Sequence, residues 1–102
     1  MGIDVISKPV YQILSELTQE PRLEVALPLA VKDLVRLRLK EAVDQRTQFE
    51  ERYVMTFSEF EQNWEQGQIP APHSFAVEQD YWEWEAAVTD EMRLRELEAT
   101  LP

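Results

Sequence analysis

The side chains best suited to chemistry in this sequence are one histidine, His73, and several closely spaced carboxylates. Nucleophilic catalysis of the Ser-His-Asp or Cys-His kind needs a base held by structured neighbours. His73 lies in a proline-rich turn, and the chain has no cysteine. The two glycines, Gly2 and Gly67, are too far apart to form a phosphate-binding loop. We therefore expect no catalytic residue of these kinds.

The carboxylates raise the alternative of a metal-dependent enzyme. Helical di-metal sites use Glu-x-x-His motifs, and this sequence has none. Glu50 and Glu51 with Glu78 and Asp80 could hold magnesium in a helical nucleotide pyrophosphohydrolase, but their spacing does not match such a motif. We expect no enzyme activity, no metal site and no cofactor.

The net charge of −10 is divided unevenly along the 102 residues. Residues 1–46 carry seven acids and seven bases, whereas residues 47–102 carry thirteen acids against three arginines. Such an acidic region repels nucleic acid and anionic membranes and attracts basic proteins. The alternative interpretation is a solvated surface that keeps the protein soluble.

The elements that must position these residues are mostly helices. Glycine is scarce, and Glu, Leu, Gln, Arg and Ala are abundant. Thr56 and Glu59 have the spacing of a capping box, Ser74 can cap a last helix, and Gly67 is placed to end the helix before it. We predict a mainly α fold, a small bundle of three to four helices in a single domain over residues 1–102. The helices are expected at residues 7–20, 28–54, 56–67 and 74–99.

The segment 22–27 shows a different pattern. Leu23, Val25 and Leu27 alternate with other residues between two prolines, which predicts a short N-terminal β-strand or extended arm. One strand is not stable alone. It would have to pair with a second copy in a dimer, with residues 3–5, or with the sheet edge of a partner.

The long helix over 28–54 has one apolar arc. Arg38 and Arg46 fall inside this arc and would need carboxylates, which the acidic half could supply. The apolar positions predict a long packing face: Leu27, Val31, Leu34, Val35, Leu39, Ala42, Phe49 and Tyr53.

The last predicted helix, 74–99, carries two apolar stripes. One stripe contains Trp84 and the other Trp82, about 160° away at 100° per residue. A helix with apolar stripes on nearly opposite sides needs cover on both, which indicates a partner. The alternative is a central helix in a four-helix arrangement with both tryptophans in the core. The first stripe is Val77, Tyr81, Trp84 and Val88, and the second is Phe75, Trp82 and Ala86.

Three runs of the sequence, ERYVMTFSEFE, HSFAVEQDYWEWEAAVTDEMRLRELE and LEVALPLAVKDLVRLRLKEA, together resemble small, acidic, helical antitoxins of prokaryotic toxin-antitoxin pairs. The resemblance covers about residues 22–97. The chain departs from the family pattern by Val54, where glycine is common, and by a helix before Pro21. The family-like positions are Tyr53, Met55, Phe57, Phe60, Ser74, Val77, Glu78, Asp80, Trp82, Trp84 and Glu85.

This resemblance implies a protein that neutralises a small toxin, often a nuclease. An acidic helix with tryptophans can mimic the polyanion that a basic toxin binds. We expect Trp84 to belong to the core. The residues expected to contact a basic, toxin-like partner are Glu78, Asp80, Trp82, Glu83 and Glu85.

Other functions stay open at this point. Arg22, Lys32, Arg36 and Lys40 form a modest basic row that would bind DNA weakly if two copies placed their rows side by side, although such a row is more often a solvated face. A helical adaptor in a larger assembly is a further alternative. We expect a cytoplasmic protein that forms homo-oligomers, with a dimer favoured, and that binds no membrane and no small-molecule ligand.

Overall fold

The computed structural model describes residues 6–102. Four helices make up most of this part of the chain: α1 (Lys8–Thr18), α2 (Leu23–Tyr53), α3 (Phe57–Glu65) and α4 (Phe75–Thr100). The predicted mainly α fold is therefore confirmed. None of these four helices is both long enough and apolar enough to cross a membrane.

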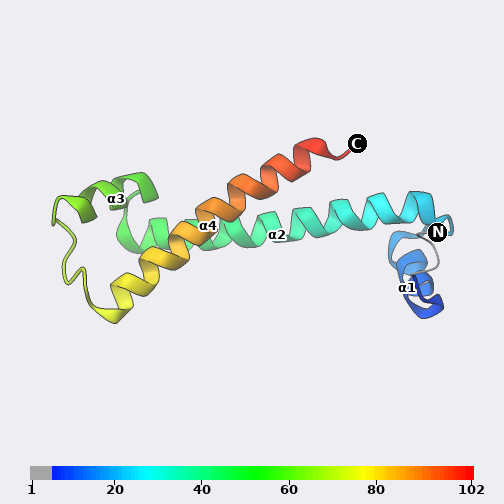
Figure 1. Ribbon diagram of the computed structural model, residues 1–102, viewed down its shortest axis with the longest axis horizontal. Coiled ribbons are helices and arrows are strands. Elements are labelled where there is room, and N and C mark those ends of the chain that lie inside the picture. Colours follow the sequence, from blue (N-terminus) through cyan, green and yellow to red (C-terminus); the bar gives the residue numbers. More distant parts are fainter. Residues whose placement is uncertain (1–5) are drawn as a thin grey trace.

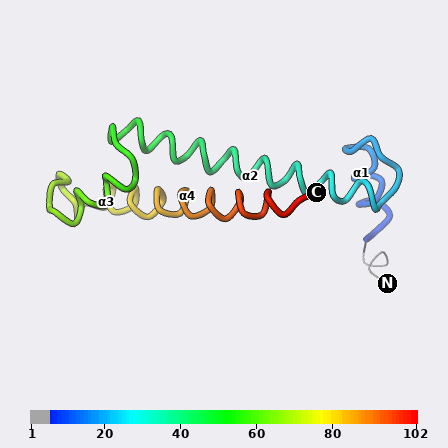
Figure 2. The backbone as a smooth tube through the Cα atoms, turned by 90° about the horizontal axis from the view of Figure 1, so that it is seen from above, coloured from blue at the N-terminus to red at the C-terminus, as the bar shows by residue number. Residues whose placement is uncertain are grey.

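The arrangement is an elongated helical hairpin with a small helix at each end (Figure 1). α4 returns antiparallel beside α2 and crosses it obliquely, and the tube view also shows the two helices side by side (Figure 2). α1 folds against the start of α2, while α3 lies at the opposite end of the molecule. The principal extents are 57 × 26 × 24 Å, so the chain is more than twice as long as it is wide.

The predicted strand at 22–27 is wrong, because α2 begins directly after Arg22. The backbone carbonyl of Arg22 accepts a hydrogen bond from the amide of Ala26 at 2.8 Å. A helix satisfies its backbone groups within one segment, whereas a lone strand cannot. Pro28 lies inside α2, and the helix continues past it although one hydrogen bond is lost. Residues 3–5, one of the pairing partners proposed for the strand, lie outside the described residues.

The buried aromatic side chains gather at the α3 end of the hairpin. Trp84 and Phe60 are completely buried. The Trp84 ring stacks on Phe49 and on Tyr53, with centroid distances of 5.6 Å to each. This cluster, which we call the aromatic core, fixes the register between α2 and α4. Its partly buried members are Met55, Phe57, Trp64, Val77, Tyr81 and Val88.

The opposite end of the hairpin has almost no core. Among residues 6–41 only Ala26 is buried, and between Val88 and Pro102 no residue is buried. The long packing face predicted for α2 is confirmed at Ala42 and Phe49, which α4 covers. It is wrong at Leu27, Val31 and Leu34, which are 39 to 52% exposed. These side chains lie on the same arc as Phe49, but α4 crosses α2 obliquely and covers this arc only near the aromatic core.

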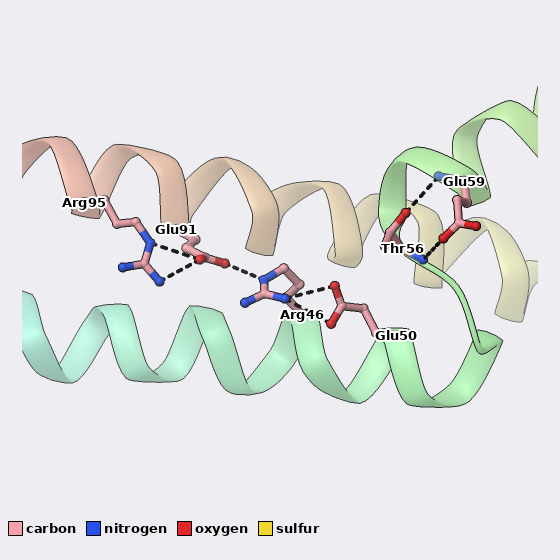
Figure 3. Close-up of polar contacts among 6 residues, drawn as sticks. All are labelled: Arg46, Glu50, Thr56, Glu59, Glu91 and Arg95. Atoms are coloured by element: carbon pink, nitrogen blue, oxygen red, sulfur yellow. Dashed lines mark hydrogen bonds and ion pairs between the residues drawn. The ribbon is translucent and has the colours of Figure 1, made fainter.

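Local signals explain where the short helices start and stop. The predicted capping box is present: the Glu59 amide donates to Thr56 Oγ1 at 3.2 Å, and the Thr56 amide donates to Glu59 Oε1 at 2.9 Å (Figure 3). Ser74 Oγ accepts from the Val77 amide at 3.3 Å at the start of α4. Ser7 stands at the N-cap of α1, but its side chain makes no capping hydrogen bond.

Candidate protein-binding surface

Trp82 and Trp84 lie on opposite sides of α4. Trp84 is 0% exposed inside the aromatic core, whereas Trp82 is 65% exposed and points away from α2. Phe75, seven residues before Trp82 and therefore about two turns away on the same side, is 83% exposed. The prediction that Trp84 belongs to the core is confirmed, and the alternative with both tryptophans in the core is wrong for the chain alone.

Carboxylates surround the exposed aromatic rings. We define the outer face of α4 as Phe75, Glu78, Trp82 and Glu85, four residues that share one side of the helix. The side chains of Glu78 and Glu85 make no hydrogen bond or ion pair with any other residue of the range 6–102. Six carboxylates and no base occur between Phe75 and Met92. The outer face is therefore aromatic and anionic, and its two carboxylates are not neutralised by described residues.

Glu83 lies at the edge of the outer face. Its Oε1 accepts a hydrogen bond from Gln79 Nε2 at 3.1 Å, one turn earlier on the same helix. This bond leaves the negative charge of Glu83 unpaired, because glutamine is neutral. Glu83 also lines an open groove of about 440 Å³ between α2 and α4, together with Ala42 and Ala87.

Asp80, which was expected to contact a partner, has a different position. Its side chain is 15% exposed, and Oδ2 accepts from Arg52 Nη1 at 2.9 Å and from the Tyr53 hydroxyl at 2.7 Å. Burial, together with the hydrogen bond to Asp80, raises the pKa of Tyr53 to about 12. The structure thus uses Asp80 to hold the end of α2 against α4, and we leave it out of the outer face. Its position four residues before Trp84, on the core side of the helix, is the sequence signal that indicates this role.

A second ion-pair network holds α4 in place midway along the hairpin (Figure 3). Arg46 Nε lies 2.5 Å from Glu91 Oε1, and Arg46 Nη1 lies 2.9 Å from a Glu50 oxygen. Arg95 Nη2 reaches Glu91 Oε2 at 2.9 Å. Partial burial raises the pKa of Glu91, but the hydrogen bonds from Arg46 and Arg95 outweigh this effect and hold the pKa below its usual value of 4.5. The expectation that the acidic half would supply a carboxylate to Arg46 is confirmed.

Arg38, the second arginine in the predicted apolar arc, behaves differently. Its Nη1 lies 3.5 Å from Glu41 on the same helix, and both side chains are largely exposed. Exposed ion pairs of this kind contribute little to stability. Arg38 therefore does not take a carboxylate from α4.

The predicted basic row is partly neutralised within the chain. Lys32, Arg36 and Lys40 share one side of α2, as their spacing requires, whereas Arg22 stands just before the helix begins. Lys40 Nζ pairs with Asp44 at 2.7 Å and Arg22 Nε pairs with Glu20 at 3.0 Å. Two of the four positive charges are thus compensated, so the row offers a weak electrostatic footprint for nucleic acid.

Metal chemistry and sequence relatives add no further site. Within residues 6–102, no group of three or more histidine, aspartate or glutamate side chains is gathered closely enough to hold a metal ion. Comparisons with protein-family models, curated proteins and solved structures found no match to the chain. The chemistry of the surface is therefore the basis for proposing a function.

Proposed function

We propose that this protein is a non-catalytic binding module whose outer face on α4 takes a basic protein partner. The observation that carries the proposal is the exposure of Trp82 among carboxylates that no described residue pairs. An exposed indole in a stretch of α4 that has no basic residue between Phe75 and Met92 places an apolar ring and negative charge on the same side. A partner with an apolar pocket rimmed by lysine or arginine complements both.

The outer face has the side chains that stabilise protein interfaces. Tryptophan is enriched among the residues that dominate binding energy, and its truncation costs about 2 kcal/mol or more. The carboxylates Glu78 and Glu85 would steer a basic protein toward Trp82 and raise the association rate at low salt. The ion pairs of Asp80 and Glu91 hold α4 firmly against α2, so little order has to be gained on binding.

The resemblance to antitoxins gives this binding activity a specific role. We propose that the protein neutralises a small basic toxin in the cytoplasm by covering its polyanion-binding surface. A helical adaptor in a larger assembly would use the same outer face for a partner that is not toxic. The two functions differ in the consequence of binding and not in its geometry.

The test uses the protein encoded by the adjacent open reading frame as the probe. We expect the two proteins to co-purify after co-expression, and expression of the probe alone to arrest growth. Trp82→Ala should weaken binding by about 30-fold, the equivalent of 2 kcal/mol. Leu17→Ala is the matched control, because Leu17 is also an exposed apolar residue, at 78%, but lies on α1, away from the outer face.

The outcomes separate the proposals. Equal affinities of the Trp82→Ala and Leu17→Ala variants would contradict the role of the outer face. Binding that depends on Trp82, by a probe that does not arrest growth, would favour the adaptor over the inhibitor. Hydrolysis of nucleotides by the protein with magnesium would overturn the non-catalytic function itself.

A further inference from the structure

The molecule exposes more surface than a compact chain of its size. Its accessible surface is 7563 Å², whereas a folded monomer of 12.0 kDa exposes about 6,000 Å². Its radius of gyration is 19.5 Å, against about 13 Å for a compact domain of this length. The excess of roughly 1,500 Å² exceeds the ~800 Å² that each partner buries in a standard interface. The extra surface is therefore large enough to contain an interface of standard size.

One run of exposed apolar side chains lies on the first half of α2. Leu27, Val31, Leu34 and Leu37 lie on the first half of α2, beyond the region where α4 buries Ala42 and Phe49, and they are 39 to 55% exposed. We call these four residues the leucine face. Figure 1 shows that this half of α2 extends away from α3 toward α1. The aromatic core packs against the second half of α2. Within residues 6–102, no comparable buried cluster packs against the leucine face.

The leucine face continues into the groove between α2 and α4. This groove begins at Arg38, one residue beyond Leu37, and its lining combines the small side chains Ala42, Ala86 and Ala87 with charged ones, among them Glu83. Small residues on neighbouring helices allow another helix to approach closely. A helix that covers the leucine face can thus approach α2 closely at Ala42, near the start of the groove.

The charge distribution indicates which molecule covers the leucine face. Residues 1–46 have a net charge of zero, whereas residues 47–102 carry the whole net charge of −10. Two copies that met through their acidic halves would repel each other, whereas two copies that meet through the leucine face bring neutral regions together. A basic partner gains no electrostatic attraction from this neutral region, so its chemistry fits the outer face better.

We infer that a second copy of this chain covers the leucine face and forms a homodimer through α2. The interface is isologous, as in most homodimers, so the two copies of α2 contact each other about a two-fold axis. The dimer uses helices in place of the strand that the sequence pattern suggested. It leaves Trp82, on the other side of the aromatic core, accessible in both copies.

Mass measurement of the full chain tests the dimer. We expect a solution mass of twice 12.0 kDa for the wild-type protein and the monomer mass for Leu34→Glu. Met92→Glu is the matched control, because it adds the same charge at a similarly exposed apolar position on the opposite flank of α4 from the groove. Circular dichroism should show unchanged helix content in both variants, since glutamate is a good helix former.

Cross-linking gives a second test that tolerates a folding defect in the glutamate variant. The chain has no cysteine, so a single cysteine at each position of the leucine face reports only on contact between copies. We expect at least one of these variants to form a covalent dimer on mild oxidation much faster than Met92→Cys. A monomeric wild-type mass, a dimeric Leu34→Glu, a monomeric Met92→Glu or equal cross-linking at all positions would each overturn the inference.

Discussion

Replacing Trp84 with alanine should destabilise the protein far more than replacing Trp82. Trp84 is completely buried and its ring contacts Phe49, Tyr53 and Phe60 at centroid distances of 5.0 to 5.6 Å. Truncation of a buried aromatic residue costs about 3–5 kcal/mol, because both transfer energy and packing are lost.

One feature of Trp84 lowers the expected cost. Its indole nitrogen is buried and donates to no acceptor among the described residues. An unsatisfied buried donor costs about 1–3 kcal/mol, and the alanine variant removes it. We therefore expect a loss near the low end, about 3 kcal/mol, which corresponds to a fall of roughly 15 °C in Tm. Trp84→Phe keeps an aromatic ring and also removes the donor, so it should lose only about 1 kcal/mol.

Urea unfolding followed by circular dichroism measures these differences, at one protein concentration because dimer formation would shift the midpoint. Trp82→Ala should change the free energy of unfolding by no more than about 0.5 kcal/mol, since Trp82 has few neighbours to lose. If Trp82→Ala lost as much stability as Trp84→Ala, the assignment of one indole to the core and one to the surface would be refuted. A larger loss for Trp84→Phe than for Trp84→Ala would refute the argument from the unpaired donor.

Two further predictions concern the ends and the middle of the hairpin. Glu91→Gln should cost about 1–2 kcal/mol at neutral pH, because it removes the charge that Arg46 and Arg95 share. Since the folded-state pKa of Glu91 is lowered, its contribution is present above about pH 4.5 and disappears as the pH falls through the folded-state value, so denaturation curves of variant and wild type should converge in acid. Val54→Gly should raise the free energy of unfolding by about 1 kcal/mol, because Val54 ends α2 with a φ of 56° and its side chain is 86% exposed. A loss of stability in Val54→Gly would show that the valine contributes contacts that outweigh its backbone strain.

The parts of the fold that the sequence predicted are those set by local chemistry. The capping box of Thr56 and Glu59 and the cap at Ser74 depend on side chains reaching backbone groups three residues away. The separation of Trp82 from Trp84 follows from helical geometry alone, because residues two positions apart in a helix point in nearly opposite directions. The caps and the separation of the two tryptophans could be predicted without knowing which helices pack together.

The predictions that failed needed information about distant neighbours. The alternation of Leu23, Val25 and Leu27 is too short to distinguish a strand from the first turn of a helix, and α1 packs against this turn to favour the helix. The residue type of Asp80 does not distinguish it from a carboxylate on the surface. Its role is decided by Arg52 and Tyr53, which approach it from the end of another helix.

The uneven core and the uneven charge divide the molecule at the same place. The acidic half contains nearly all the buried aromatic residues, so it can keep its shape without help while its like charges oppose contact with another copy. The neutral half has almost no core and exposes its leucines, so it gains stability from association and meets no electrostatic barrier to it. The acidic half thus supplies the stable core, and the neutral half supplies the surface for pairing. A pairing surface at one end of the hairpin and an anionic aromatic surface at the other can be occupied together, because neither covers the other.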